Sequence, residues 1–164
     1  EHVLDPVLQE VYLWHGSQFG SALQICQEGF DERTAAQSGL FGTGNYFTSE
    51  AWKALQYARA DGCSIQRKKC RSKICHCQRR QRLLYCRVLL GDPHYASHPL
   101  KGTCRPPERQ ASQGGGRHDS IIANHGISNG TRHGIQQHRE FVVWNHLGAQ
   151  AYPEFLVHIE MLPA

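Results

Sequence analysis

A cluster of soft metal ligands is the most concentrated chemical feature of the sequence. Four cysteines and a histidine fall within fifteen residues: Cys63, Cys70, Cys75, His76 and Cys77. Zinc takes four thiolate or imidazole ligands in a tetrahedron. The chain has seven cysteines, an odd number, and their clustering favours a metal site in a reducing compartment over a disulfide framework. Reduced surface cysteines are the alternative.

Three other places hold residues that could bind a ligand or assist a reaction. His15-Gly16 ends an apolar run, Tyr46 follows a glycine-rich stretch, and Glu140 opens an apolar run. Taken singly, none of these features is specific. Tyr46 could be a core aromatic, His15 a buried polar residue with satisfied hydrogen bonds, and Glu140 an exposed acid at the start of a strand. The glycines at 39–44 match neither a dinucleotide fingerprint nor a Walker loop.

The first half of the chain predicts a strand and a helix that position His15. Val11 to Trp14 is β-prone and leads directly into His15. From Phe19 the apolar residues recur at helical spacing, with Ser17 as a possible N-cap and Gly29 as the end of the helix. We therefore expect His15 at the end of a strand.

A second helix is predicted over residues 49–59. Its apolar residues fall on one face, Ser49 could cap its start, and Gly62 could close its end. The glycine-rich stretch at 38–47 lies before this helix and is expected to form a turn that leads into Tyr46 and Phe47.

The second half of the chain is richer in strands. Residues 91–116 and 124–138 show no periodicity and are expected to be surface loops. Helices at the front and strands behind predict an α+β fold built on antiparallel sheet. We expect one domain over residues 1–164. Short apolar or alternating runs predict strands at Leu83–Leu90, Ser120–Ala123, Glu140–Asn145 and Glu154–Met161.

Composition excludes some functional classes. With 40% hydrophobic and 20% charged residues the chain is typical of a globular protein, and it has no apolar run long enough to span a membrane. The chain starts at Glu1 without a signal sequence, which indicates a piece of a longer protein. The clustered cysteines favour an intracellular location, in the cytoplasm or nucleus.

Basic residues concentrate in one segment. Residues 67–82 hold eight lysines and arginines and no acidic residue, although the net charge of the chain is only +4. This segment could contact nucleic acid, although a solvated loop is the simpler interpretation. It lacks the interleaved aromatic residues of single-strand binders.

Seven motifs in order give these features a common interpretation. Together they closely resemble the poly(ADP-ribose) polymerase catalytic domain, of the diphtheria-toxin-like, His-Tyr-Glu type, and the tankyrase branch is nearest. Tyr57, eleven residues after Tyr46, extends the resemblance. The motifs are Leu13–Ser17, Glu28–Arg33, Gly39–Phe47, Leu84–Val88, His118–Ile122, Arg139–Val143 and Gln150–Leu156.

The resemblance implies an ADP-ribosyltransferase fold with split antiparallel β-sheets and short flanking helices. It also implies that NAD⁺ is the substrate, that ADP-ribose moves to an acceptor, expected to be a protein, and that nicotinamide leaves. The implied catalytic residues are His15, Tyr46 and Glu140. The implied NAD-binding set is His15, Gly16, Ser17, Tyr46, Phe47, Ala54, Tyr57 and Glu140.

Five residues of this set have an implied role. His15 would hydrogen-bond the adenosine ribose, the backbone of Gly16 would pair with the nicotinamide amide, and Tyr46 and Tyr57 would sandwich the nicotinamide ring. Glu140 would bind the nicotinamide ribose and stabilise positive charge that develops on it.

The sequence departs from the family at two positions. The family usually has serine where this chain has Ala54, so one hydrogen bond to the nicotinamide amide is lost. Asn45 stands where the family prefers an apolar residue. The missing bond leaves two hypotheses open: an active transferase, or a weak or inactive member that binds NAD, ADP-ribose or a partner.

The tankyrase branch also carries a zinc site where this chain has its cysteine cluster. We therefore expect a zinc-binding insertion at residues 62–78 that holds structural Zn²⁺. The expected ligands are Cys63, Cys70 and Cys75, completed by Cys77 or His76.

Overall fold

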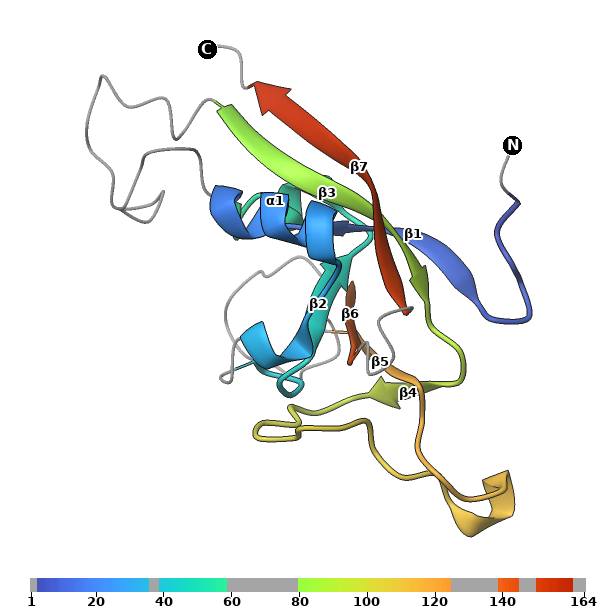
Figure 1. Cartoon of the computed structure of the whole chain (residues 1–164). Helices are drawn as coiled ribbons and strands as arrows, with labels where there is room; N and C mark the ends of the chain where they lie inside the picture. The colour runs from blue at the N-terminus through green and yellow to red at the C-terminus, as the bar shows by residue number, and fades with distance from the viewer. Residues whose placement is uncertain (1–2, 36–38, 59–79, 125–138, 145–149, 161–164) are drawn as a thin grey trace.

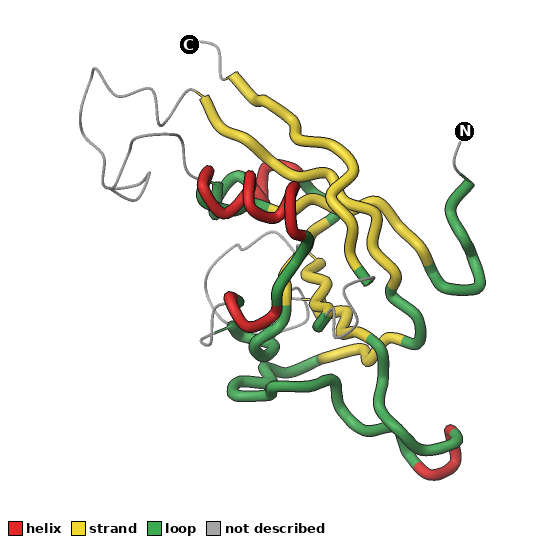
Figure 2. The backbone as a smooth tube through the Cα atoms, viewed as in Figure 1, coloured by secondary structure: helices red, strands yellow, loops and turns green. Residues whose placement is uncertain are grey.

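The computed structural model describes residues 3–35, 39–58, 80–124, 139–144 and 150–160. Strands dominate, and the helices are short (Figures 1 and 2). The strands are β1 (Glu10–His15), β2 (Asn45–Thr48), β3 (Arg80–Leu89), β4 (Pro93–Ala96), β5 (Ser120–Asn124), β6 (Arg139–Val143) and β7 (Ala151–Glu160). The helices are α1 (Phe19–Glu28) and α2 (Ala51–Ala54), with 3₁₀ turns at Glu32–Thr34 and Ala111–Gln113.

Within the described ranges the strands form one seven-stranded sheet in the order β4-β5-β6-β2-β1-β3-β7. Every neighbouring pair is antiparallel except β4 and β5, which are parallel. The join between β2 and β1 is narrow, because only Trp14 and Thr48 pair across it. The sheet is therefore nearly divided into two halves at this point, and the α+β, mostly antiparallel prediction is confirmed.

Helix α1 begins and ends close to the predicted positions. Gly29 takes a φ of 84° at its C-terminus and donates its N–H to the carbonyl of Ile25. A positive φ carries little steric cost for glycine, which explains why the helix ends there. The predicted cap was wrong: Gln18, not Ser17, is the N-cap, and its side chain makes no capping hydrogen bond.

Helix α2 is shorter than predicted. It covers only Ala51–Ala54, its N-cap is Glu50 and not Ser49, and the chain continues in turns to Tyr57. The predicted closing residue, Gly62, lies outside the described residues. Because α2 is only one turn long, its packing against β1 and β2 keeps this segment helical.

The predicted strands are confirmed with shifted ends, and two strands were not predicted. β3 and β7 are each longer than expected, with ten residues. β2 lies in the stretch that was expected to form only a turn, and β4 lies inside the stretch 91–116 that was expected to be a loop. Both have four residues, so they carry little periodic signal and depend on pairing with β6 and β5.

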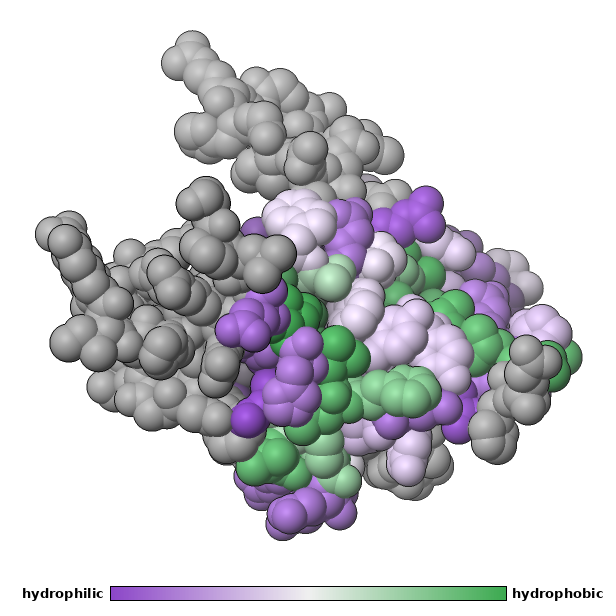
Figure 3. All heavy atoms as spheres, turned by 90° about the horizontal axis from the view of Figure 1, so that it is seen from above, coloured by the Kyte–Doolittle hydropathy of each residue, from purple (hydrophilic) through white to green (hydrophobic). Residues whose placement is uncertain are grey.

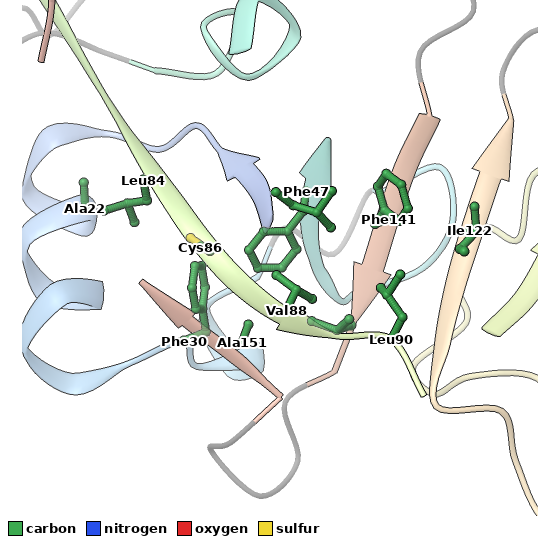
Figure 4. Close-up of a cluster of buried hydrophobic side chains, with 12 residues drawn as sticks. Ala22, Phe30, Phe47, Leu84, Cys86, Val88, Leu90, Ile122, Phe141 and Ala151 are labelled. Atoms are coloured by element: carbon green, nitrogen blue, oxygen red, sulfur yellow. The ribbon is translucent and has the colours of Figure 1, made fainter. Parts of the chain in front are cut away.

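The hydrophobic core lies on both faces of the sheet. α1 covers one face, where its Ala22 belongs to the buried cluster that also contains Leu84, Cys86 and Phe47 (Figure 4). α2 lies against the opposite face, where Ala54 packs with Leu83. Figure 3 shows hydrophobic and hydrophilic residues interspersed on the outer face seen from above. Within the described part of the chain, no helix is long and apolar enough to cross a membrane.

Candidate functional site

A cavity of about 1030 Å³ lies where β1 and β2 diverge. Its lining comes from the end of β1, from α1 and the loop after it, from β2, from α2 and from the start of β6. A volume of this size suits a ligand at least as large as a typical small-molecule cofactor. The structure brings the whole predicted ligand set to it: His15, Gly16, Ser17, Tyr46, Phe47, Ala54, Tyr57 and Glu140.

The register of β2 and β6 brings Tyr46 and Glu140 to the same face of the sheet. Glu140 pairs with Thr48, and Tyr46 pairs with Val142 two residues away. Because side chains alternate along a strand, Tyr46, Thr48 and Glu140 project to one side. Tyr46 and Glu140 are thus diagonal neighbours, although ninety-four positions separate them in the sequence.

The glycine-rich turn before β2 holds the Tyr46 hydroxyl. This hydroxyl accepts a hydrogen bond from the backbone N–H of Phe41 and donates one to the carbonyl of Gly42, each at 2.8 Å. Gly42 has a φ of 96°, a conformation that glycine adopts at little cost. Burial raises the pKa of Tyr46 to about 12, so the phenol stays neutral. The two hydrogen bonds of the hydroxyl fix the position of the ring.

Lys53 is the charged partner of Glu140. The Lys53 Nζ lies 3.4 Å from the Glu140 Oε1, and only 17% and 10% of the two side chains are exposed. Because water screens a shielded pair less, the Coulomb attraction between these two charges is stronger than between the charges of a surface pair. The Lys53 Nζ also lies 5.5 Å from the centre of the Tyr57 ring, which is itself exposed. The Lys53 ammonium therefore contacts both the Glu140 carboxylate and the ring of Tyr57.

His15 is positioned by a backbone carbonyl and two aromatic rings. Its Nδ1 lies 2.8 Å from the carbonyl oxygen of Tyr46. A carbonyl only accepts, so Nδ1 carries the proton and Nε2 of the neutral ring is left as an acceptor. Burial lowers the pKa of His15, which favours this neutral form. The ring centres of Phe30 and Phe47 lie 5.0 and 5.4 Å from that of His15.

Gly16 allows α2 to approach the end of β1. A Cβ atom at this position would lie 1.9 Å from the carbonyl oxygen of Ala54 and 3.2 Å from the backbone nitrogen of Ala58. Any side chain here would displace the segment that carries Lys53 and Ala54. The structure thus gives Gly16 a packing role in addition to the ligand contact that the resemblance implies.

Ala54 is nearly completely buried, with 2% of its surface exposed, and it packs against Leu83 and Ala58. It lines the cavity beside Gly16 and Tyr57, but its methyl group cannot donate a hydrogen bond. This is the position where the resemblance leads one to expect serine. The wall of the cavity is apolar here.

Sequence reasoning assigned no role at the site to Lys53 or to Asp31 and Arg33 in the loop after α1. Lys53 shares a predicted helix with many residues, and no pattern distinguishes it before the register of β2 and β6 is known. In the loop after α1, Arg33 forms a paired hydrogen bond with Asp31, and both line the cavity. The Asp31 side chain also caps the 3₁₀ turn, because it accepts a hydrogen bond from the N–H of Arg33. An aspartate at this spacing is a turn signal that could have suggested the contact from the sequence.

The predicted zinc ligands Cys63, Cys70, Cys75, Cys77 and His76 lie outside the described residues. So do most of the basic segment 67–82 and nearly all of the predicted loop 124–138. Within the described ranges there is no group of side chains that could hold a metal ion, and the three cysteines there, Cys26, Cys86 and Cys104, are free thiols. Arg82 lies in β3 and donates a hydrogen bond to His158.

Comparison with protein families finds a match that covers nearly the whole chain. The model of the poly(ADP-ribose) polymerase catalytic domain matches residues 5–161, which includes every strand and helix described above.

Proposed function

This chain belongs to the poly(ADP-ribose) polymerase catalytic domain family, and we propose that it is an active NAD-dependent ADP-ribosyltransferase. At the family level the match implies NAD as substrate and ADP-ribose transfer as the reaction. The observation that supports activity in this chain is the convergence of His15, Tyr46, Lys53 and Glu140 on one cavity.

The reaction breaks the bond between the nicotinamide nitrogen and C1′ of the ribose. Nicotinamide leaves with the electron pair, and the ribose develops oxocarbenium-like positive charge until an acceptor nucleophile bonds to C1′ and loses its proton. Glu140 is suited to stabilise that charge, because only 10% of its side chain is exposed, so water screens its carboxylate little. We assign to it contact with the ribose hydroxyl and orientation of the acceptor.

The remaining residues bind and orient NAD. Tyr46 offers a ring whose hydroxyl both accepts and donates a hydrogen bond, and the exposed Tyr57 offers a second ring that lines the cavity. His15 offers the Nε2 of a neutral imidazole as an acceptor for a ribose hydroxyl. Lys53 holds the Glu140 carboxylate in place. Such positioning lowers the barrier because the reacting groups no longer have to find one another.

Several finer assignments belong to this proposal. We place the chain nearest the tankyrase branch, with residues 1–164 as one catalytic domain. We propose structural Zn²⁺ in the insertion at residues 62–78, held by Cys63, Cys70 and Cys75 together with Cys77 or His76. A protein is the acceptor class that we favour. Metal analysis of protein purified without chelator tests the zinc, since about one zinc per chain is expected and none would contradict it.

A binding module without turnover is the second candidate, and buried Ala54 is the observation that favours it. The missing hydroxyl removes about 1 kcal/mol of net binding, a several-fold loss of affinity that leaves the catalytic carboxylate in place. We therefore favour the active enzyme.

NAD labelled in its adenylate half distinguishes the two candidates. An active transferase attaches the label to protein, and Glu140→Gln suppresses the labelling. A binding module shows heat of ligand binding in calorimetry without label transfer or nicotinamide release. Absence of both label transfer and nicotinamide release at high enzyme and NAD concentrations would contradict the active enzyme.

A further inference from the structure

Thr48, the last residue of β2, has a hydroxyl whose proton is unused. The residue is buried, and it lines the cavity. Its Oγ1 accepts a hydrogen bond from the backbone N–H of Glu50 at 3.3 Å. A hydroxyl also has one proton to donate, and none of the residues that the structure describes accepts it. The proton is therefore available to a ligand in the cavity.

The neighbours of Thr48 place its side chain on the cavity side of β2. Thr48 pairs with Trp14 on β1 and with Glu140 on β6, and paired residues project to the same face of a sheet. On that face Trp14 packs against the cluster that contains Ala54, which also lines the cavity. Tyr46, two residues before Thr48, projects the same way. The Thr48 side chain therefore lies on the face where Tyr46 and Glu140 reach the cavity.

Thr48 is the direct cross-strand neighbour of Glu140. The Cβ atoms of such a pair lie about 4.5–5.5 Å apart, so a ligand atom that reaches the Glu140 carboxylate also comes close to Thr48. Within the described ranges the carboxylate forms an ion pair with Lys53, whose Nζ lies 3.4 Å from its Oε1, and it accepts no hydrogen bond from the Thr48 hydroxyl. A carboxylate acceptor and a hydroxyl donor thus lie side by side in the cavity wall.

A ribose hydroxyl can bond to both groups at once. It has one proton and two lone pairs, so a hydroxyl that donates to a carboxylate still has lone pairs that accept. Hydrogen bonds that run in one direction, from Thr48 to the ribose and from the ribose to Glu140, polarise and strengthen one another. A phosphate does not fit here, because it has no proton for Glu140 and its charge repels the carboxylate.

We propose that Thr48 is a further substrate-binding residue, whose hydroxyl donates a hydrogen bond to the ribose hydroxyl that Glu140 binds. Two neighbouring strands then hold the nicotinamide ribose of NAD, with the acceptor on β6 and the donor on β2. This inference rests on the proposed function, since it assumes that NAD occupies the cavity with this ribose at Glu140.

Ligands with and without this ribose test the proposal. Calorimetry would measure the affinity for ADP-ribose, which contains it, and for ADP and free nicotinamide, which do not. Thr48→Val keeps the shape of the side chain and removes the hydroxyl, Thr48→Ala removes the hydroxyl and a methyl group, and Thr48→Ser keeps the hydroxyl. Thr103→Val is the matched control, because Thr103 does not line the cavity.

Thr48→Val and Thr48→Ala should weaken ADP-ribose binding by about three- to tenfold, the worth of one net hydrogen bond. The KM for NAD should rise by a similar factor. Affinities for ADP and for nicotinamide should not change, because neither ligand has the ribose hydroxyl. Thr48→Ser should bind ADP-ribose as the wild type does, and Thr103→Val should leave all three affinities unchanged.

Unchanged affinity for ADP-ribose in Thr48→Val and Thr48→Ala would overturn the inference. An equal loss for ADP-ribose and ADP, or the same loss in Thr48→Ser or Thr103→Val, would also overturn it by showing a packing effect. Because binding is measured without turnover, the proposed function is tested separately by nicotinamide release from the wild type. A wild type that binds ADP-ribose but releases no nicotinamide contradicts the transferase alone, and one that does not bind ADP-ribose overturns this inference whatever its activity.

Discussion

Replacing Gly16 by alanine tests whether close packing of α2 on β1 builds the site. The new Cβ would lie 1.9 Å from the carbonyl oxygen of Ala54. An ordinary contact is about 3.4 Å, so that oxygen must retreat by roughly 1.5 Å. The same oxygen accepts hydrogen bonds from the N–H groups of Tyr57 and Ala58 at 3.0 and 3.3 Å, and those bonds would weaken.

We expect Gly16→Ala to lose about 2–3 kcal/mol of unfolding free energy, the usual cost of overpacking. The melting temperature should fall by roughly 6–10 °C in a chain of this size. Because α2 carries Lys53, whose Nζ lies 3.4 Å from Glu140, the KM for NAD should also rise. Urea unfolding, calorimetry and a nicotinamide-release assay measure the three effects.

Gly20→Ala is the matched control. Gly20 is exposed in α1, and a Cβ there would meet nothing within 4 Å. Both substitutions restrict the unfolded chain equally, so their difference isolates the clash at Gly16. Gly20→Ala should stabilise the protein by about 0.5–1 kcal/mol without changing the KM. A Gly16→Ala protein as stable and active as Gly20→Ala would refute the packing argument.

Three further predictions concern the cavity. Ala54→Ser should tighten nicotinamide binding about fivefold by restoring one donor, as calorimetry would measure, and weaker or unchanged binding would show that the hydroxyl cannot reach the ligand. Lys53→Met should lower kcat more than it raises the KM, because it removes the ion pair that helps to position the Glu140 carboxylate, and a change in KM alone would assign Lys53 to binding only. Burial lowers the pKa of His15 in the folded state. Its protonation should therefore destabilise the fold once the pH falls below about 6.5, the unfolded value. Melting curves of wild type and His15→Gln between pH 8 and 5 should diverge on the acid side, and parallel curves would contradict this.

Patterns within single segments predicted much of the fold. β1 and the long strands β3 and β7 carry enough alternating or apolar residues to be recognised. The order of motifs predicted a catalytic set whose members all line one cavity. β4 is different: its four residues are strand because β5 pairs with them in parallel, a non-local interaction.

The contacts within the site could not be predicted without the register of the sheet. That Glu140 pairs with Thr48, and so lies beside both Tyr46 and Lys53, depends on strands almost a hundred residues apart in the sequence. The tertiary arrangement thus adds the partners of residues that the motifs had already named.

The most direct test of the central claim compares nicotinamide release from NAD by the wild type and by Glu140→Gln, with ADP-ribose binding measured in parallel. Glutamine keeps the shape of the side chain and removes its charge. We predict that the wild type releases nicotinamide and that the variant does so at least about a hundredfold more slowly, while its affinity for ADP-ribose changes only a few-fold. Equal release rates in the two proteins would contradict the role of Glu140, and no release by the wild type would contradict the transferase itself.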